Sequence, residues 1–115
     1  MLEPVTAAVL LKTLDGLSLR ASVNAQNIAN AGTPGYRPLR VSFESALATA
    51  AQQGAATVDA VRPSVFPEPR WGVGDAMRLD LEVVETSLTA GRYSAMIELL
   101  NRHAQIAALA VSGGR

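Results

Sequence analysis

The chain has 115 residues, of which 49% are hydrophobic and 17% charged, and its ten basic residues balance ten acidic ones. That length suits one small domain, and the composition is too apolar for a disordered charged tail. A net charge of zero argues against nucleic acid as the main partner, because phosphate binding usually shows as a basic excess. The lack of cysteine excludes disulfides and thiolate metal sites.

Residues 4–31 are predicted to form one long helix. Small and apolar residues recur along it at alternating steps of four and three, which is a heptad seam sustained over three heptads. Asn24 is the one polar member, and a single seam asparagine commonly fixes the register of helix packing. The seam consists of Leu10, Leu14, Leu17, Ala21, Asn24, Ile28 and Ala31.

The same N-terminal segment resembles neither a cleavable signal peptide nor a membrane span. Glu3 comes early, no basic stretch precedes the apolar run, and Lys12 and Asp15 interrupt that run. If the protein leaves the cytoplasm, we expect a route that removes no such segment.

Several signals for the end of this helix come together. Gly32 suits a left-handed position just after the helix, and Pro34 lies shortly beyond it. Residues 33–36 place proline second and glycine third, as a type II turn requires. The chain is then expected to be extended, because the residue before Pro38 is disfavoured in a helix.

The middle of the chain is predicted to be short and irregular. Ser42 is a candidate N-cap for a short helix that stops before Gly54, which opens a loosely specified linker. Residues 55–74 contain three prolines and two glycines. They are expected to form an extended loop or short hairpin without a helix.

A second long helix is predicted over residues 80–111. Asp80 is its candidate N-cap, and Glu82 and Glu85 suit a solvated first part near the positive helix end. One apolar face comprises Tyr93, Met96, Ile97, Leu100, Ala104, Ala107 and Val111. The opposite side is also apolar, with Val84, Leu88, Ala95, Leu99 and Ile106.

The expected fold is therefore mainly α. Two long terminal helices form a coiled-coil-like hairpin, antiparallel if the middle folds back, in a single domain spanning residues 1–115. One partner helix cannot bury both sides of a helix that is apolar nearly all round. Either other subunits surround the second helix or the middle segment folds back as a cover, and the pattern favours assembly.

The stretch "NAQNIANAGTPGYRPLRVSFESAL" resembles the N-terminal signature of bacterial flagellar axial proteins, which include the rod, hook and hook-associated proteins. Their pattern is Asn-Ile-Ala-Asn followed by Thr-Pro-Gly-Tyr. The matching residues are Asn27, Ile28, Ala29, Asn30, Thr33, Pro34, Gly35 and Tyr36. The last helix also resembles that of the rod proteins at Leu79, Asp80, Glu82 and Tyr93.

The small size of the chain points within this group to the flagellar basal-body rod protein family. Hook and distal-rod proteins insert large domains between the two helices, and this chain has little there. Phe43 and Leu47 are similar to the FlgB type of proximal rod protein. The FlgC type is the alternative, although the stretch before the last helix reads "GDAMRLD" and not the "NVN" typical of that type. The FlgB type often has Gly-Asn there, whereas Asp75 follows Gly74 here.

This resemblance implies a structural subunit of the periplasmic rod, the shaft that transmits motor torque for motility. It implies export through the flagellar export apparatus without a cleaved signal peptide. The implied partners are other rod proteins, copies of the chain itself and the junction protein between rod and motor ring. The resemblance implies no enzyme activity, no cofactor and no small-molecule substrate.

The residues themselves also argue against catalysis. The only histidine, His103, lies among polar residues of the last helix, where an interface histidine is expected and not a catalytic base. Glu82 and Glu85 have no third ligand nearby, so no metal site is expected. Gly32 and Gly35 lack the Lys and Ser/Thr of a phosphate loop.

Three asparagines precede the turn at a spacing of three residues. Asn24, Asn27 and Asn30 should form a polar stripe beside the seam, and their amides can both donate and accept hydrogen bonds. The stripe could fix register between neighbouring backbones, and Tyr36 could pack back against a helix. A simple helix stop is the alternative, although it leaves the asparagines unexplained.

Two sets of residues are therefore candidates for the function. The predicted assembly motif comprises Asn24, Asn27, Ile28, Ala29, Asn30, Thr33, Pro34, Gly35 and Tyr36. The predicted helix-packing set comprises Leu10, Leu14, Leu17, Ala21, Tyr93, Met96, Ile97 and Leu100. Besides a rod subunit, a non-flagellar helical adaptor or export chaperone could use the same seam to bind a partner helix.

Overall fold

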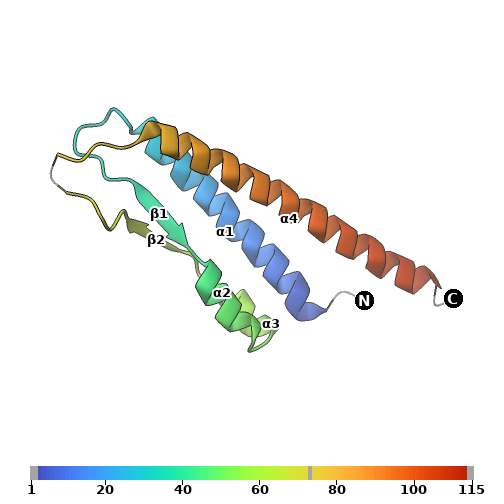
Figure 1. Cartoon of the computed structure of the whole chain (residues 1–115). Coiled ribbons are helices and arrows are strands. Elements are labelled where there is room, and N and C mark those ends of the chain that lie inside the picture. Colours follow the sequence, from blue (N-terminus) through green and yellow to red (C-terminus); the bar gives the residue numbers. More distant parts are fainter. Residues whose placement is uncertain (1–2, 73, 114–115) are drawn as a thin grey trace.

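The computed structural model describes residues 3–72 and 74–113. Two long helices, α1 (Pro4–Ala29) and α4 (Leu79–Gly113), form a hairpin (Figure 1). They run antiparallel, because Asn27 contacts Glu82 while the earlier Asn24 contacts the later Thr89. The mainly α prediction with two long terminal helices is confirmed.

The molecule is elongated, with principal extents of 66 × 26 × 14 Å. Its radius of gyration is 17.8 Å, whereas a compact chain of this length would have about 13 Å. Within the described residues, no helix combines the length and the apolar character needed to cross a membrane.

The middle of the chain folds into a small unit of two strands and two short helices. In chain order these are β1 (Leu39–Ser42), α2 (Glu44–Ala51), α3 (Ala55–Asp59) and β2 (Ser64–Pro67). The strands pair antiparallel, with Leu39 opposite Pro67 and Ser42 opposite Ser64. Figure 1 shows α1 lying between this middle unit and α4.

The apolar core lies between α1 and the middle unit, and only Met96 of α4 packs against it. Val58 is fully buried and Phe43 is 2% exposed. The middle segment therefore folds back as a cover, as the monomer alternative supposed, but it covers α1. Most of α4 stays exposed, with Leu88 at 47% and Leu109 at 71%.

Phe43 packs on α1 at a position where only glycine fits. A Cβ added to Gly16 would lie 2.5 Å from two carbons of the Phe43 ring. The Arg20 guanidinium lies 4.9 Å from the centroid of this ring and donates to the Val41 carbonyl at 2.8 Å. Gly16 and Arg20 of α1 thereby fix the place where β1 passes into α2.

The capping prediction for Ser42 is wrong, because Ser42 is the last residue of β1 and Phe43 holds the N-cap position of α2. The backbone N–H of Phe43 is instead satisfied by the side chain of Glu44, at 3.4 Å. α2 has no side-chain cap hydrogen bond, but the carboxylate of Glu44 in its first turn favours the positive helix end.

α1 ends at Ala29, two residues before the predicted boundary. Asn30 caps it: its side-chain amide donates to the Gln26 carbonyl at 2.9 Å, and its side-chain oxygen accepts from the Thr33 hydroxyl at 3.1 Å. Gly32 does not take the predicted left-handed conformation, because this asparagine cap already ends the helix.

The predicted turn after α1 is confirmed. Gly35 has φ +75°, and the Tyr36 N–H donates to the Thr33 carbonyl at 3.2 Å. Both features are those of a type II turn with glycine third. The chain then becomes extended and enters β1 at Leu39, as expected.

The prediction that residues 55–74 lack a helix is wrong for their first part. Gly54, at φ +106°, turns the chain into α3, so it is not a loosely specified linker position. α3 buries Val58 completely, and Lys12 of α1 donates to the carbonyl of Asp59 at 3.0 Å. These contacts with α1 stabilise α3 although prolines follow it in the sequence, one of them, Pro67, at the end of β2.

α4 begins at Leu79 and ends at Gly113, so Asp80 lies inside the first turn and is not the N-cap. Asp80 instead pairs with Arg78 at 2.8 Å.

The less exposed positions of α4 recur at steps of four and three, which places one heptad stripe against α1. This stripe comprises Glu82, Thr86, Thr89, Met96, Leu100, His103 and Ala107. Tyr93 continues the register but is 39% exposed.

The predicted packing residues are thus only partly buried. In α1, Leu10 and Leu17 are buried and Leu14 and Ile28 are half-buried, whereas Ala21 is exposed. Ala31, which lies beyond the end of α1, is also exposed. In the last helix, Ile97 is 38% and Val111 65% exposed. A strict seam fails because α1 is covered from two sides, by α4 and by the middle unit, while α4 is covered from one.

Candidate assembly site

Asn27 is the centre of a group of buried polar side chains near the bend. Its side-chain nitrogen donates to the Leu39 carbonyl at 2.9 Å and to Glu82 at 3.2 Å. Its side-chain oxygen accepts from the Leu39 N–H at 2.9 Å and from the Tyr36 hydroxyl at 3.0 Å. An asparagine side chain has two donor hydrogens and two acceptor sites, so its hydrogen-bonding capacity is fully used. One side chain thereby joins α1, the turn, β1 and α4.

Glu82 is the charged member of this group and is only 2% exposed. Its second carboxylate oxygen lies 2.7 Å from the Arg40 guanidinium, which also contacts Glu68 at 2.7 Å. Burial disfavours the charge on Arg40, but the hydrogen bonds that its guanidinium donates to Glu82 and Glu68 outweigh this and raise its pKa. The prediction that Glu82 is solvated is wrong, because β1 places the Arg40 guanidinium in contact with its carboxylate. We call Asn27, Arg40 and Glu82 the polar node.

A second polar contact joins the same helices farther along. The Asn24 side chain donates to the Thr89 hydroxyl at 3.3 Å, and both residues are almost completely buried. Within the described residues, every buried side-chain nitrogen and oxygen has a hydrogen-bond partner. Since a buried amide would lose these partners if the helices slid, Asn24 and Asn27 fix the register of α1 against α4.

The predicted assembly motif divides into two parts. Asn24, Asn27 and Tyr36 make internal contacts, and Asn30 caps α1. Ile28 is half-buried. The exposed remainder, at or beside the bend between α1 and β1, is Ala29, Thr33, Pro34 and Gly35. Asn24 and Asn27 contact α4 of the same chain, so the expected contact of the asparagine stripe with neighbouring subunits stays a prediction.

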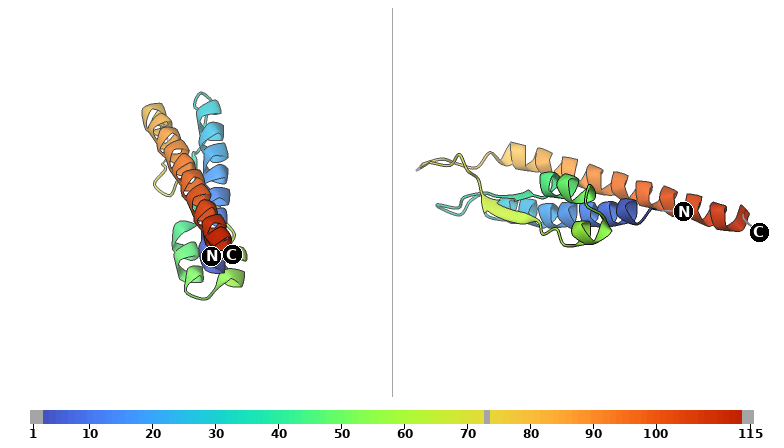
Figure 2. Two further views of the ribbon diagram at one scale, coloured as in Figure 1. Left: turned by 90° about the vertical axis from the view of Figure 1, so that its right-hand side faces the viewer. Right: turned by 90° about the horizontal axis from the view of Figure 1, so that it is seen from below.

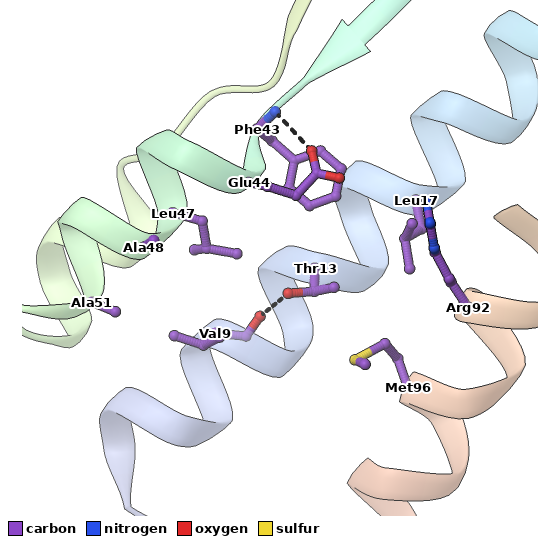
Figure 3. Close-up of a pocket in the computed structure, with 10 residues that line it drawn as sticks. All are labelled: Val9, Thr13, Leu17, Phe43, Glu44, Leu47, Ala48, Ala51, Arg92 and Met96. Atoms are coloured by element: carbon purple, nitrogen blue, oxygen red, sulfur yellow. Dashed lines mark hydrogen bonds between the residues drawn. The ribbon is translucent and has the colours of Figure 1, made fainter.

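An apolar groove of about 460 Å³ runs along α1 between α2 and α4 (Figure 3). Val9, Thr13 and Leu17 line it from α1, and Leu47, Ala48 and Ala51 line it from α2. The α4 side contributes Met96 and Arg92, and Phe43 and Glu44 complete the lining.

Glu44, at one end of the groove, is held by Arg20, which contacts both of its carboxylate oxygens at 2.7 Å. This hydrogen bonding lowers the pKa of Glu44 to about 2. The carboxylate therefore stays ionised, and its pairing with Arg20 ties the first turn of α2 to α1.

Apolar side chains of α4 are exposed around most of the helix. The exposed fractions are about half or more at Leu81, Val83, Val84, Leu88, Ile106, Leu109 and Val111. These positions include the side opposite the heptad stripe, as the two-sided pattern predicted. Exposed apolar surface gathered along one helix commonly marks an interaction site.

Comparisons with known proteins gave no match to any protein-family model. No curated protein matched the chain either.

Sequence reasoning missed several residues that position this site. Arg40, Thr89 and the buried role of Glu82 carry no local signal, because their partners are distant in sequence. Gly16 did carry one: a glycine inside an apolar helical pattern often marks a close approach of another group. The Phe43 ring is that group.

Proposed function

We propose that the chain is a structural subunit of the bacterial flagellar basal-body rod, most similar to the proximal FlgB type, with the FlgC type as the alternative. The observation that carries the proposal is the exposed apolar surface of α4, on a chain whose sequence resembles the axial-protein motif. A helix that exposes Leu81, Leu88 and Leu109 in one molecule gains stability when neighbours cover it.

The polar node supports a mechanical role in such a shaft. A subunit that transmits torque must resist sliding of its two helices past each other. Two leucine-lined helices could slide by a turn at little cost, whereas a shift here would strand the amide of Asn27 and the buried carboxylate of Glu82. The node thus suits a hairpin that must keep its helix register under torque.

The proposal places the chain in the periplasmic rod after export by the flagellar export apparatus without cleavage of a signal peptide. Its partners there are other rod proteins, further copies of itself and the junction protein between rod and motor ring. It works without a cofactor, a metal or a small-molecule substrate, and catalyses no reaction.

The test is deletion of the gene in the bacterium that encodes this chain, followed by complementation. We expect the deletion strain to stop swimming and to yield basal bodies without rod and hook, and the intact gene to restore both. Normal swimming and complete basal bodies in the deletion strain would exclude the proposal.

The groove gives one specific reason to keep a second candidate, a helical adaptor or export chaperone. A partner helix could dock over Val9, Ala48 and Met96 in a soluble complex. Fractionation separates the two functions. A rod subunit is recovered with purified basal bodies, whereas an adaptor or chaperone stays with its soluble partner.

A further inference from the structure

We infer that the groove between α1, α2 and α4 receives the C-terminal segment of α4, residues 104–113, from a second copy of the chain. The contact is one-way, so each copy offers a groove to one neighbour and a segment to another. The inference rests on the proposed function for this open arrangement, and on the structure for the two surfaces.

Within the described residues, the C-terminal segment is exposed except at Ala107, which is half-buried. α4 has 35 residues and α1 has 26, and α4 continues past the N-terminal end of α1 (Figure 2). Ile106 is 61% exposed, Leu109 71% and Val111 65%. Among the described residues, these are the three most exposed large hydrophobic side chains, so this end of α4 has the most to gain from a partner.

The lengths of the segment and the groove correspond. The nine extra residues of α4 extend roughly 14 Å at 1.5 Å per residue. On α1, the floor of the groove runs from Val9 to Leu17, about 12 Å along the helix. Two to three helical turns of the segment would therefore lie over the floor from end to end.

The surfaces also correspond in charge and in side-chain size. The sequence of the segment, "AQIAALAVSG", contains no charged residue, and the only charged residues lining the groove are Glu44 and Arg92. The segment contains several alanines, and the α2 wall of the groove contains Ala48 and Ala51. Small side chains on both sides allow two helices to approach closely. The aliphatic side chains of the segment would replace water over Val9, Ala48 and Met96, apolar lining residues that are exposed or half-buried.

The groove cannot be filled by the segment of the same molecule. α4 is one continuous helix that carries residues 104–113 away from the groove (Figure 1). The occupant must come from another molecule, and a contact between two different surfaces of identical chains extends into an open array unless the rotation closes a ring.

Two variants of the full chain test each half of the contact. Ala48→Trp fills the groove, with Ala46→Trp as its control on an exposed position of α2 outside the lining. Leu109→Glu places a charge on the segment, with Ser112→Glu as its control. Circular dichroism is used to check that all four variants keep the helix content of the wild type.

Sedimentation velocity over a range of concentrations measures the result. The wild type and both controls should associate beyond a dimer as concentration rises. Ala48→Trp alone and Leu109→Glu alone should remain monomeric, with association weakened at least tenfold. An equimolar mixture of the two should form dimers that grow no further, because the intact segment of one fits the intact groove of the other.

Three outcomes would overturn the inference: a wild type that stays monomeric or stops at a dimer, single variants that associate like the wild type, or a mixture that associates no more than its components. These results do not depend on whether the chain belongs to the rod. If both variants enter basal bodies normally, the groove contact fails while the proposed function stands. If the mixture forms dimers but gene deletion leaves swimming intact, the groove contact stands and the proposed function fails.

Discussion

The amide nitrogen of Asn27 in α1 and a carboxylate oxygen of Glu82 in α4 lie 3.2 Å apart, and both side chains are almost fully buried. These residues belong to the first and the last helix and meet because the middle unit reverses the direction of the chain. The contact is one of four that use every hydrogen-bonding site of Asn27.

Asn27→Asp should therefore destabilise the chain by about 3 kcal/mol, because it removes two donors and places a second carboxylate beside buried Glu82. The measurement is urea unfolding followed by circular dichroism at neutral pH. The matched control is Asn101→Asp on the exposed surface of α4, which should change stability by less than about 0.5 kcal/mol. Equal stabilities of the two variants would contradict the role given to the polar node.

Gly16→Ala should destabilise the chain although alanine is the better helix former. The new methyl group would lie 2.5 Å from the Phe43 ring, so the ring or the helix must move, at a cost on the order of 1–3 kcal/mol. Gly91→Ala is the control, because nothing lies within 4 Å of a Cβ added in α4. It should stabilise the chain by up to about 1 kcal/mol. The measurement is the midpoint of thermal unfolding of both variants. If the two midpoints shift from the wild-type value in the same direction, the packing argument is refuted.

The Arg20–Glu44 pair should make stability depend on acidity. The folded-state pKa of Glu44 is about 2, below its ordinary 4.5, so its contribution is present above the ordinary value and is lost as pH falls through 2. The side chain of Glu44 is 58% exposed, which limits that contribution to about 1 kcal/mol. We expect Glu44→Gln to be less stable than the wild type at pH 6, with the difference shrinking between pH 5 and pH 2. A difference that stays constant over this range would show that the pair contributes nothing through charge.

Gly35→Val should impair assembly more than folding of the single chain. Gly35 has φ +75°, where a β-branched residue is strained by about 1–3 kcal/mol, although nothing lies within 4 Å of an added Cβ. A free chain can relax this exposed turn, whereas neighbours in a rod would hold it. Under the proposed function, secretion should be near normal while swimming is lost.

Gly32→Val provides the control, because Gly32 has no positive φ and also has open space around it. Motility plates with secretion measured in parallel distinguish the two variants. Normal swimming by the Gly35→Val strain would remove the turn from the assembly argument.

Features set by neighbouring residues were predictable from the sequence, and features set by distant partners were not. The turn at Pro34 and Gly35 is local chemistry, and it is present as expected. The two long helices follow from apolar spacing. The prediction that Glu82 is solvated was wrong because Arg40, 42 positions earlier, pairs with its buried carboxylate.

The short helix α3 shows the same limit. Its five residues precede a proline-rich stretch, so propensity favoured a loop, but burial of Val58 against α1 stabilises the helix. The stripe of α4 that faces α1 differs from the predicted apolar face for a related reason. Glu82 and Thr89 face α1 because they form hydrogen bonds with Asn27 and Asn24. A search of the sequence for apolar faces does not find such polar positions.

The most direct test of the central claim is an electron cryomicroscopy map of basal bodies purified from the bacterium that encodes this chain. We expect the hairpin of α1 and α4 to be traceable in the proximal rod, with the exposed apolar side chains of α4 covered by neighbouring subunits. A rod fully accounted for by other proteins, with this chain absent from it, would contradict the account.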